Sequence, residues 1–161
     1  MATKTPRTFQ ARIESLEHRE VLSTVALGHH VLALRGNGTG AVASVQNLPG
    51  GGFQTVTNLD GRANALGHFG GQVLSTFAGN GSTTNDSAVL VAQNGDQLNL
   101  FYSGGYRAPR GHSTRAQGTF HFTVTGGTGR FASATGGGTL VATIDTNSGA
   151  STFRINGRVS Q

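Results

Sequence analysis

Apolar and polar residues alternate with a period of two along most of the chain after residue 24. In the segment GTFHFTVTGG (118–127), Phe120, Phe122 and Val124 fall on one face and His121 falls on the other. The same alternation occurs in 96–105, 138–145 and 151–160, and shorter stretches of this kind lie at Phe53–Thr57, Val73–Phe77 and Ser87–Ala92. A period of two is typical of a β-strand with one buried face. The pattern therefore predicts an all-β domain.

Glycine-rich turns separate the alternating segments. Asn94-Gly95 lies between two of them, and Asn80-Gly81 and residues 145–149 (DTNSG) are of the same kind. These residue types favour the positive φ angles that tight hairpins need. No stretch beyond residue 25 has helical periodicity over three turns. Strands joined by hairpins are therefore expected, rather than β-α-β units.

The segment HFTVTGGTGRFASATGGG (121–138) invites two other interpretations. Gly127, Gly129 and Ala132 spell the G-x-G-x-x-A fingerprint of dinucleotide-binding proteins. That fingerprint opens a helix, whereas here three further glycines follow after about one helical turn. A calcium-binding β-roll needs an acidic ligand at the position of Phe131. The segment therefore predicts a connector between strands with Phe131 turned back into the core, and no cofactor is expected.

The first 24 residues have a different character. Phe9, Ile13 and Leu16 recur at helical spacing with charged residues between them. This spacing predicts a short amphipathic helix, with a disordered segment as the alternative. The segment is too short and too charged to span a membrane, so no transmembrane segment is predicted. The chain is thus divided into an N-terminal targeting-like segment, residues 1–24, and a strand domain, residues 25–161.

The stretch RIESLEHREVLS (12–23) resembles the LEPR-XLL type of N-terminal tag, which many exported and surface proteins of one bacterial phylum carry. The residues that fit this pattern are Leu16, Glu17, Arg19, Leu22 and Ser23. His18 stands where the tag has proline. An ordinary solvated helix is the alternative. The resemblance implies an exported bacterial protein that is extracellular or associated with the cell surface.

Three further segments carry a second resemblance. The first is VTGGTGRFASATGGGTL (124–140), which resembles the hallmark segment of the allene oxide cyclase and dirigent-like barrel superfamily. A G-x-A-x-x-L-G-x-F element and an A-x-N-G-D-x-L element precede it, as in a bacterial branch of small secreted domains. They are matched here by Gly61, Ala63, Leu66, Gly67 and Phe69, and by Ala92, Asn94, Gly95, Asp96 and Leu98.

This resemblance implies that residues 25–161 form an eight-stranded, antiparallel, calycin-like barrel, preceded by the short N-terminal helix. The lumen of such a barrel is either filled by side chains or holds one small ligand. Plant relatives form oligomers and steer or cyclise apolar small molecules. The resemblance therefore implies a small apolar ligand and a homo-oligomer as partners.

The apolar face of the predicted strands supplies the candidate ligand-binding residues. They are Tyr102, Leu98, Leu100, Phe120, Phe122, Leu140, Ile144 and Phe153, and Ile155 lies on the same face. Simple core packing is the alternative for all of them. Tyr102 has a hydroxyl group that could orient a ligand.

Charge adds one more candidate site. The net charge of +5 comes almost entirely from arginines, which are scattered, so nucleic acid is not expected as a partner. The stretch YRAPRGHSTR (106–115) nevertheless concentrates Arg107, Arg110 and Arg115. These arginines predict an anion-binding rim at the barrel mouth, for a carboxylate, a glycan phosphate or a lipid headgroup, with a solvated loop as the alternative.

No residue is assigned a catalytic or metal-binding role. The chain has no cysteine, which excludes disulfides and zinc–thiolate sites. His68 and His121 are expected at the surface of strands. The four later aspartates, Asp60, Asp86, Asp96 and Asp145, are expected in turns, where they would cap backbone amides.

The expected function is therefore non-enzymatic. The domain would be an exported or surface-associated barrel that binds a small apolar molecule in its lumen. One alternative is an isomerase or cyclase that holds an apolar substrate in one conformation. The other is a structural or adhesive module with a filled lumen. An enzyme needs a polar group that points inward, whereas a binding module needs only the cavity and a structural module needs neither.

Overall fold

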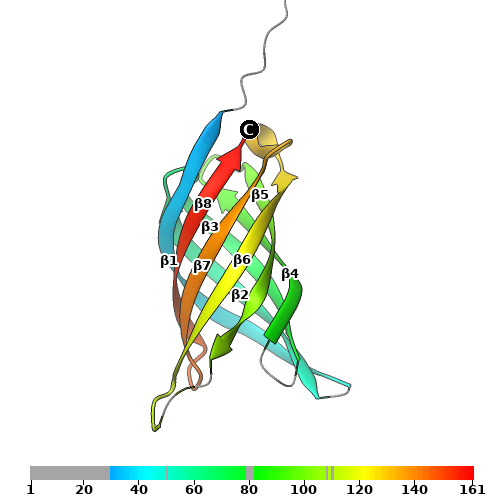
Figure 1. Ribbon diagram of the computed structural model, residues 1–161, viewed down its shortest axis with the longest axis vertical. Helices are drawn as coiled ribbons and strands as arrows, with labels where there is room; N and C mark the ends of the chain where they lie inside the picture. Colours follow the sequence, from blue (N-terminus) through cyan, green and yellow to red (C-terminus); the bar gives the residue numbers. More distant parts are fainter. Residues whose placement is uncertain (1–29, 50, 79–81, 108, 110) are drawn as a thin grey trace, which may run out of the picture.

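The computed structural model describes residues 30–49, 51–78, 82–107, 109 and 111–161. Eight antiparallel strands form one closed barrel, in which each strand pairs with the next and β8 pairs with β1 (Figure 1). The strands are β1 (Val31–Leu48), β2 (Gly52–Ala63), β3 (Gly67–Phe77), β4 (Ser82–Ala92), β5 (Gln97–Arg107), β6 (Arg115–Gly127), β7 (Thr135–Asp145) and β8 (Ala150–Ser160). The predicted all-β, eight-stranded antiparallel barrel is confirmed. The predicted N-terminal helix, the tag and the turn at Asn80-Gly81 lie outside the described residues.

The two-residue alternation predicted the faces of the strands correctly. In β6, Phe120, Phe122 and Val124 are buried, and His121 is exposed on the outer surface. Two of the four aspartates, however, were placed wrongly. Asp60 lies within β2 and Asp86 within β4, because the strands extend further than the apolar stretches that predicted them.

The two ends of the barrel differ. The connections β2–β3, β4–β5 and β6–β7 lie at the end where the chain's C-terminus also lies (Figure 1). The β6–β7 connection contains a short 3-10 helix, η1 (Gly129–Phe131), and the side chain of Phe131 is completely buried. The prediction that Phe131 turns back into the core is thus confirmed. We call this end the closed end and the opposite end the mouth.

The closed end is packed with apolar side chains. Its core consists mainly of Leu34, Ala63, Leu66, Phe69, Ala92, Leu98, Val124, Phe131, Ala134 and Val159. Arg130 ties the connection to the barrel, because its Nη2 atom donates to the carbonyl of Ala65 at 3.1 Å. Its Nε atom lies 3.5 Å from a carboxylate oxygen of Asp96. All three sequence segments that carry the barrel resemblance therefore meet at the closed end.

Inward-facing glycines make room for phenylalanine rings. A Cβ atom at Gly138 or Gly157 would lie 2.9 Å or 2.6 Å from the ring of Phe122. Similarly, a Cβ atom at Gly118 would lie 2.7 Å from the ring of Phe120. Real side chains do not approach so closely, and cores tolerate such overpacking poorly. The rings of Phe120 and Phe122 therefore occupy space that side chains at these three positions would fill.

Candidate functional site

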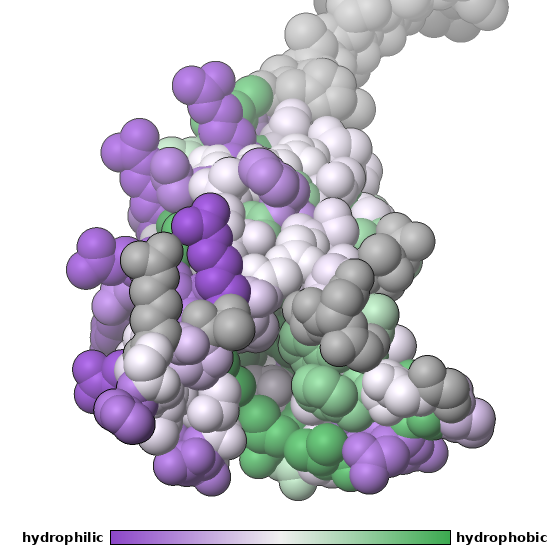
Figure 2. Space-filling view, turned by 60° about the horizontal axis from the view of Figure 1, so that its bottom comes forward, coloured by the Kyte–Doolittle hydropathy of each residue, from purple (hydrophilic) through white to green (hydrophobic). Residues whose placement is uncertain are grey.

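The mouth half of the barrel is hollow. A cavity of about 560 Å³ opens at the end of the barrel opposite η1 and reaches the middle of the strands. Aliphatic and aromatic side chains of all eight strands line it, together with the β7–β8 turn. Figure 2, which brings the mouth forward, shows apolar side chains gathered around a hollow. The cavity has the size and the apolar character of a small-molecule site.

Seven of the eight predicted ligand-binding residues line this cavity. They are Leu100, Tyr102, Phe120, Phe122, Leu140, Ile144 and Phe153, and Ile155 lines it as well. Leu98 does not, because it lies nearer the closed end, where it is completely buried in the core. The period of two gave the correct face for Leu98 but not its depth along the barrel axis.

Aromatic rings form one continuous side of the cavity. Phe53 and Phe77 stack with their ring centres 4.9 Å apart at the lip of the mouth. Further in, the ring of Tyr106 lies 6.2 Å from that of Phe77 and 5.1 Å from that of Phe120. Tyr102 meets the same Phe120 ring edge-on at 5.8 Å. Such contacts hold the rings in fixed orientations, which gives the cavity a defined shape.

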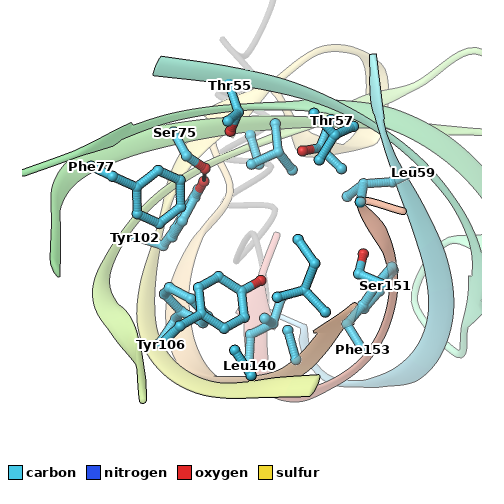
Figure 3. A pocket seen from close by; sticks show the side chains of 18 of the residues that line it. Thr55, Thr57, Leu59, Ser75, Phe77, Tyr102, Tyr106, Leu140, Ser151 and Phe153 are labelled. Atoms are coloured by element: carbon cyan, nitrogen blue, oxygen red, sulfur yellow. Dashed lines mark hydrogen bonds between the residues drawn. The ribbon is translucent and has the colours of Figure 1, made fainter. Parts of the chain in front are cut away.

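Hydroxyl groups project into this apolar space. Figure 3 shows Thr55, Thr57, Ser75, Tyr102, Tyr106 and Ser151 around the cavity. The hydroxyl groups of Ser75 and Tyr102 are hydrogen-bonded to each other (Figure 3). Of these residues only Tyr102 was predicted, and Thr55, Thr57, Ser75, Tyr106 and Ser151 were not. The alternation could have found the first three of these, since Thr55 and Thr57 share a face with Phe53, and Ser75 shares one with Phe77.

Both tyrosines remain protonated at neutral pH. Burial raises the pKa of Tyr106 to about 12. Burial also raises the pKa of Tyr102 well above its usual value, and the nearby carboxyl group of Asp86 raises it further, although the hydrogen bond with Ser75 lowers it. Each phenol can therefore donate or accept a hydrogen bond, but neither can act as a base at neutral pH.

Asp86 is a buried acid in the barrel wall beside Tyr102. It is 4% exposed and does not line the cavity. Its Oδ1 atom accepts a hydrogen bond from the backbone N–H of Thr76 at 2.7 Å, where the pairing of β3 with β4 is interrupted between Leu74 and Phe77. Its Oδ2 atom has no hydrogen-bond partner among the described residues. Burial raises the pKa of Asp86 above its usual value.

The predicted arginine rim lies outside the cavity. Arg107 and Arg115 are both exposed, on β5 and β6 next to the mouth. On these strands the residues that face the lumen are Tyr106 and Ala116, so the neighbouring arginines face outward. Arg110 lies outside the described residues. Anion binding by Arg107 and Arg115 stays a prediction, but its place would be the outer wall.

His68 and His121 lie on the outer surface as expected. His68 is exposed, and its Nε2 atom lies 3.1 Å from a carboxylate oxygen of Asp60 on the neighbouring strand. In the part of the chain that the structure describes, no three histidine, aspartate or glutamate side chains come close enough to hold a metal ion. A helix that is long and apolar enough to cross a membrane is not found among the described residues either.

Comparisons of the chain with protein-family models, with curated proteins and with solved structures found no match. The cavity itself is therefore the main indication of function.

Proposed function

We propose that the barrel domain is a non-enzymatic binding module that holds one small, largely apolar molecule in its lumen. The observation that carries this proposal is the cavity of about 560 Å³, open at the mouth and lined by apolar side chains. Ligand sites typically combine such a lining with a few polar groups that orient the ligand. The cavity favours binding over the alternative of a structural module with a filled lumen.

Two tryptophan substitutions at adjacent positions of β7 test this function. Leu140 lines the cavity, whereas Val141 is 38% exposed on the outer face. The probe is N-phenyl-1-naphthylamine, a neutral apolar dye that becomes fluorescent in apolar surroundings. We expect the wild type and Val141→Trp to bind the dye alike. Leu140→Trp fills part of the cavity and should bind it at least about tenfold more weakly. Equal binding by all three proteins would show that the dye does not enter the lumen.

A cyclase or isomerase is the second candidate, and one observation favours it. The Ser75–Tyr102 pair is the inward-pointing polar group that such an enzyme needs. Acting mainly by confining an apolar substrate, the enzyme would need little acid–base assistance. Tyr102→Phe distinguishes the two candidates. In a binding module it changes only the affinity for the ligand, whereas in an enzyme it also changes the rate or the products formed from a bound substrate.

We also propose that the barrel is calycin-like and related to the allene oxide cyclase and dirigent-like superfamily. What supports this is the place of the three resembling segments, which meet at the closed end around Phe131 and Arg130. There they serve packing and chain reversal, so they support kinship in fold and not a shared activity.

Export to the cell surface remains a proposal that rests on residues 12–23. It predicts that the full chain is recovered from the surface or the medium of a bacterium whose surface proteins carry this tag. A variant with Leu16 and Leu22 replaced by serine should stay inside the cell. Recovery of both proteins in the same fraction would contradict this role of the segment.

A further inference from the structure

The polar groups of the cavity are almost all uncharged. Within the barrel they are the hydroxyl groups of Thr55, Thr57, Ser75, Tyr102, Tyr106 and Ser151, and at the mouth they are the uncharged side chains of Thr146, Asn147 and Ser148. Among the described residues no lysine, arginine or histidine lines the cavity, and the acid that does is Asp145 at the mouth. Hydrogen bonds from Thr114, Ser148 and Asn147 lower the pKa of Asp145 to about 2, so it is ionised at neutral pH.

An anionic ligand would therefore be poorly accommodated. A carboxylate that enters an apolar cavity loses its hydration and needs a cation to replace it. The described cations near the mouth, Arg107 and Arg115, face outward, and the ionised Asp145 would repel a second negative charge. Neutral hydroxyl groups cannot compensate fully for the cost of burying an ion.

The Ser75–Tyr102 pair can serve an uncharged oxygen atom. Two hydroxyl groups carry two protons, and their mutual hydrogen bond uses one of them. The second O–H remains available to a ligand, because neither hydroxyl has another hydrogen bond to a described residue. The phenol of Tyr106 also points into the cavity (Figure 3) and has no side-chain hydrogen bond to a described residue.

We propose that the lumen selects uncharged apolar molecules that carry a hydrogen-bonding oxygen atom, such as long-chain ketones, and that Ser75 and Tyr102 bind that oxygen. This inference rests on the proposed binding function and names the class of ligand. It excludes the fatty-acid type of ligand that an arginine rim would favour.

The test uses the protein's own fluorescence. Tyr102 and Tyr106 are the two tyrosines of the chain, which has no tryptophan. Both line the cavity, so tyrosine emission reports on the lumen. The full chain is titrated at pH 8 with three probes of equal chain length: decan-2-one, decanoate and decylammonium. We expect decan-2-one to bind at least about tenfold more tightly than either ion, because the apolar lining cannot replace the hydration of an anion or of a cation, and Asp145 lies only at the mouth.

Variants then locate the oxygen site. Tyr102→Phe and Ser75→Ala each break the hydrogen-bonded pair and should weaken the binding of decan-2-one by about three- to tenfold. Ser75→Ala retains both tyrosines as reporters, and Tyr102→Phe retains Tyr106. Ser103→Ala removes a neighbouring hydroxyl on the outer face of β5 and should leave the affinity unchanged.

Each outcome decides something different. If decanoate or decylammonium binds as tightly as the ketone, the selectivity is refuted while the binding function stands. If both pair variants bind decan-2-one as the wild type does, the oxygen site is refuted. If none of the three probes binds, the proposed binding function fails, and this inference fails with it.

Discussion

At the scale of single residues, the cavity depends on where side chains are missing. The ring of Phe122 lies over Gly138 and Gly157 on the two strands that follow β6 in the barrel. A methyl group at either glycine would meet this ring or the backbone of a neighbouring strand. The many glycines of the sequence are thus not confined to turns, since several leave space that large rings occupy.

Gly157→Ala tests this arrangement. Its Cβ atom would lie 2.6 Å from the Phe122 ring and 2.5 Å from the carbonyl oxygen of Gly137. We expect a loss of about 1–3 kcal/mol in the free energy of unfolding, measured by urea denaturation. Gly70→Ala is the control, because its nearest neighbour would be 3.7 Å away. It should cause no loss, since this is an ordinary van der Waals contact and alanine restricts the unfolded chain more than glycine does. Equal losses at both positions would contradict the packing argument.

Asp86 makes the stability depend on pH. A carboxyl group whose pKa is raised by folding binds more protons in the folded chain than in the unfolded chain. Its contribution to the free energy of unfolding therefore falls as the pH rises from the unfolded-state pKa through the folded-state pKa. Asp86→Asn keeps an oxygen for the N–H of Thr76 and removes this titration. We expect the variant to gain stability relative to the wild type as the pH rises over the range above the usual carboxyl pKa of about 4. A constant difference between the two denaturation curves over this range would contradict the assignment.

At the scale of elements, the β6–β7 connection is the part that closes the barrel. The backbone N–H of Thr128 donates to the carbonyl of Gln97 at 2.9 Å, and the hydroxyl of Thr128 accepts from the N–H of Gln97 at 3.0 Å. These bonds and those of Arg130 hold η1 over the end of the lumen, where Phe131 fills the space between the strands.

Phe131→Ala should cost about 3–5 kcal/mol of unfolding free energy, because it leaves a large void in the packed half of the barrel. Phe101→Ala is the matched control, since Phe101 is 51% exposed on the outer face of β5. It should cost less than about 1 kcal/mol, as do most surface substitutions. Guanidinium denaturation of the two variants measures both values. Similar costs for both substitutions would mean that η1 does not plug the barrel.

Seven of the eight strands and their inward faces could be predicted from the sequence because both follow from the period of two. β1 was not predicted, because glycines occupy the inward positions 36, 38 and 40, where the pattern needs apolar side chains. Seven of eight candidate residues consequently reach the cavity wall. The division of the lumen into a packed and a hollow half could not be predicted, since it depends on which rings lie over glycines of other strands. Asp86 was predicted in a turn, and its place within β4 could not be predicted for a related reason. The hydrogen bond from the N–H of Thr76 to the Asp86 carboxylate requires an interruption in the pairing of β3 and β4, which the local sequence does not encode.

At the scale of the whole molecule, the barrel has one closed hydrogen-bonded wall, interrupted locally between β3 and β4 and between β4 and β5, and two kinds of interior. Every strand has a partner on both sides, so no edge is left open. Apolar contacts across the interior are dense at the closed end around Phe131 and Leu98. They are sparse in the mouth half, where the cavity replaces them.

This asymmetry predicts a gradient of amide hydrogen exchange along each strand. In β6, amides near Val124 lie at the closed end and should exchange by global unfolding, whereas those near Ala116 should exchange by local opening at lower free energy. In β5 the same difference is expected between Leu98 and Tyr106. Comparison within β6 is the sharper control, because its residues 117–124 are paired with both neighbouring strands, whereas the pairing of β5 with β4 is interrupted between Thr83 and Asp86. Uniform protection along both strands would mean that the cavity does not loosen the mouth.

Adding decan-2-one at about 100 times its Kd should raise the free energy of unfolding by about 2.7 kcal/mol. Because a molecule in the lumen replaces missing contacts, the protection of the mouth half should then approach that of the closed end.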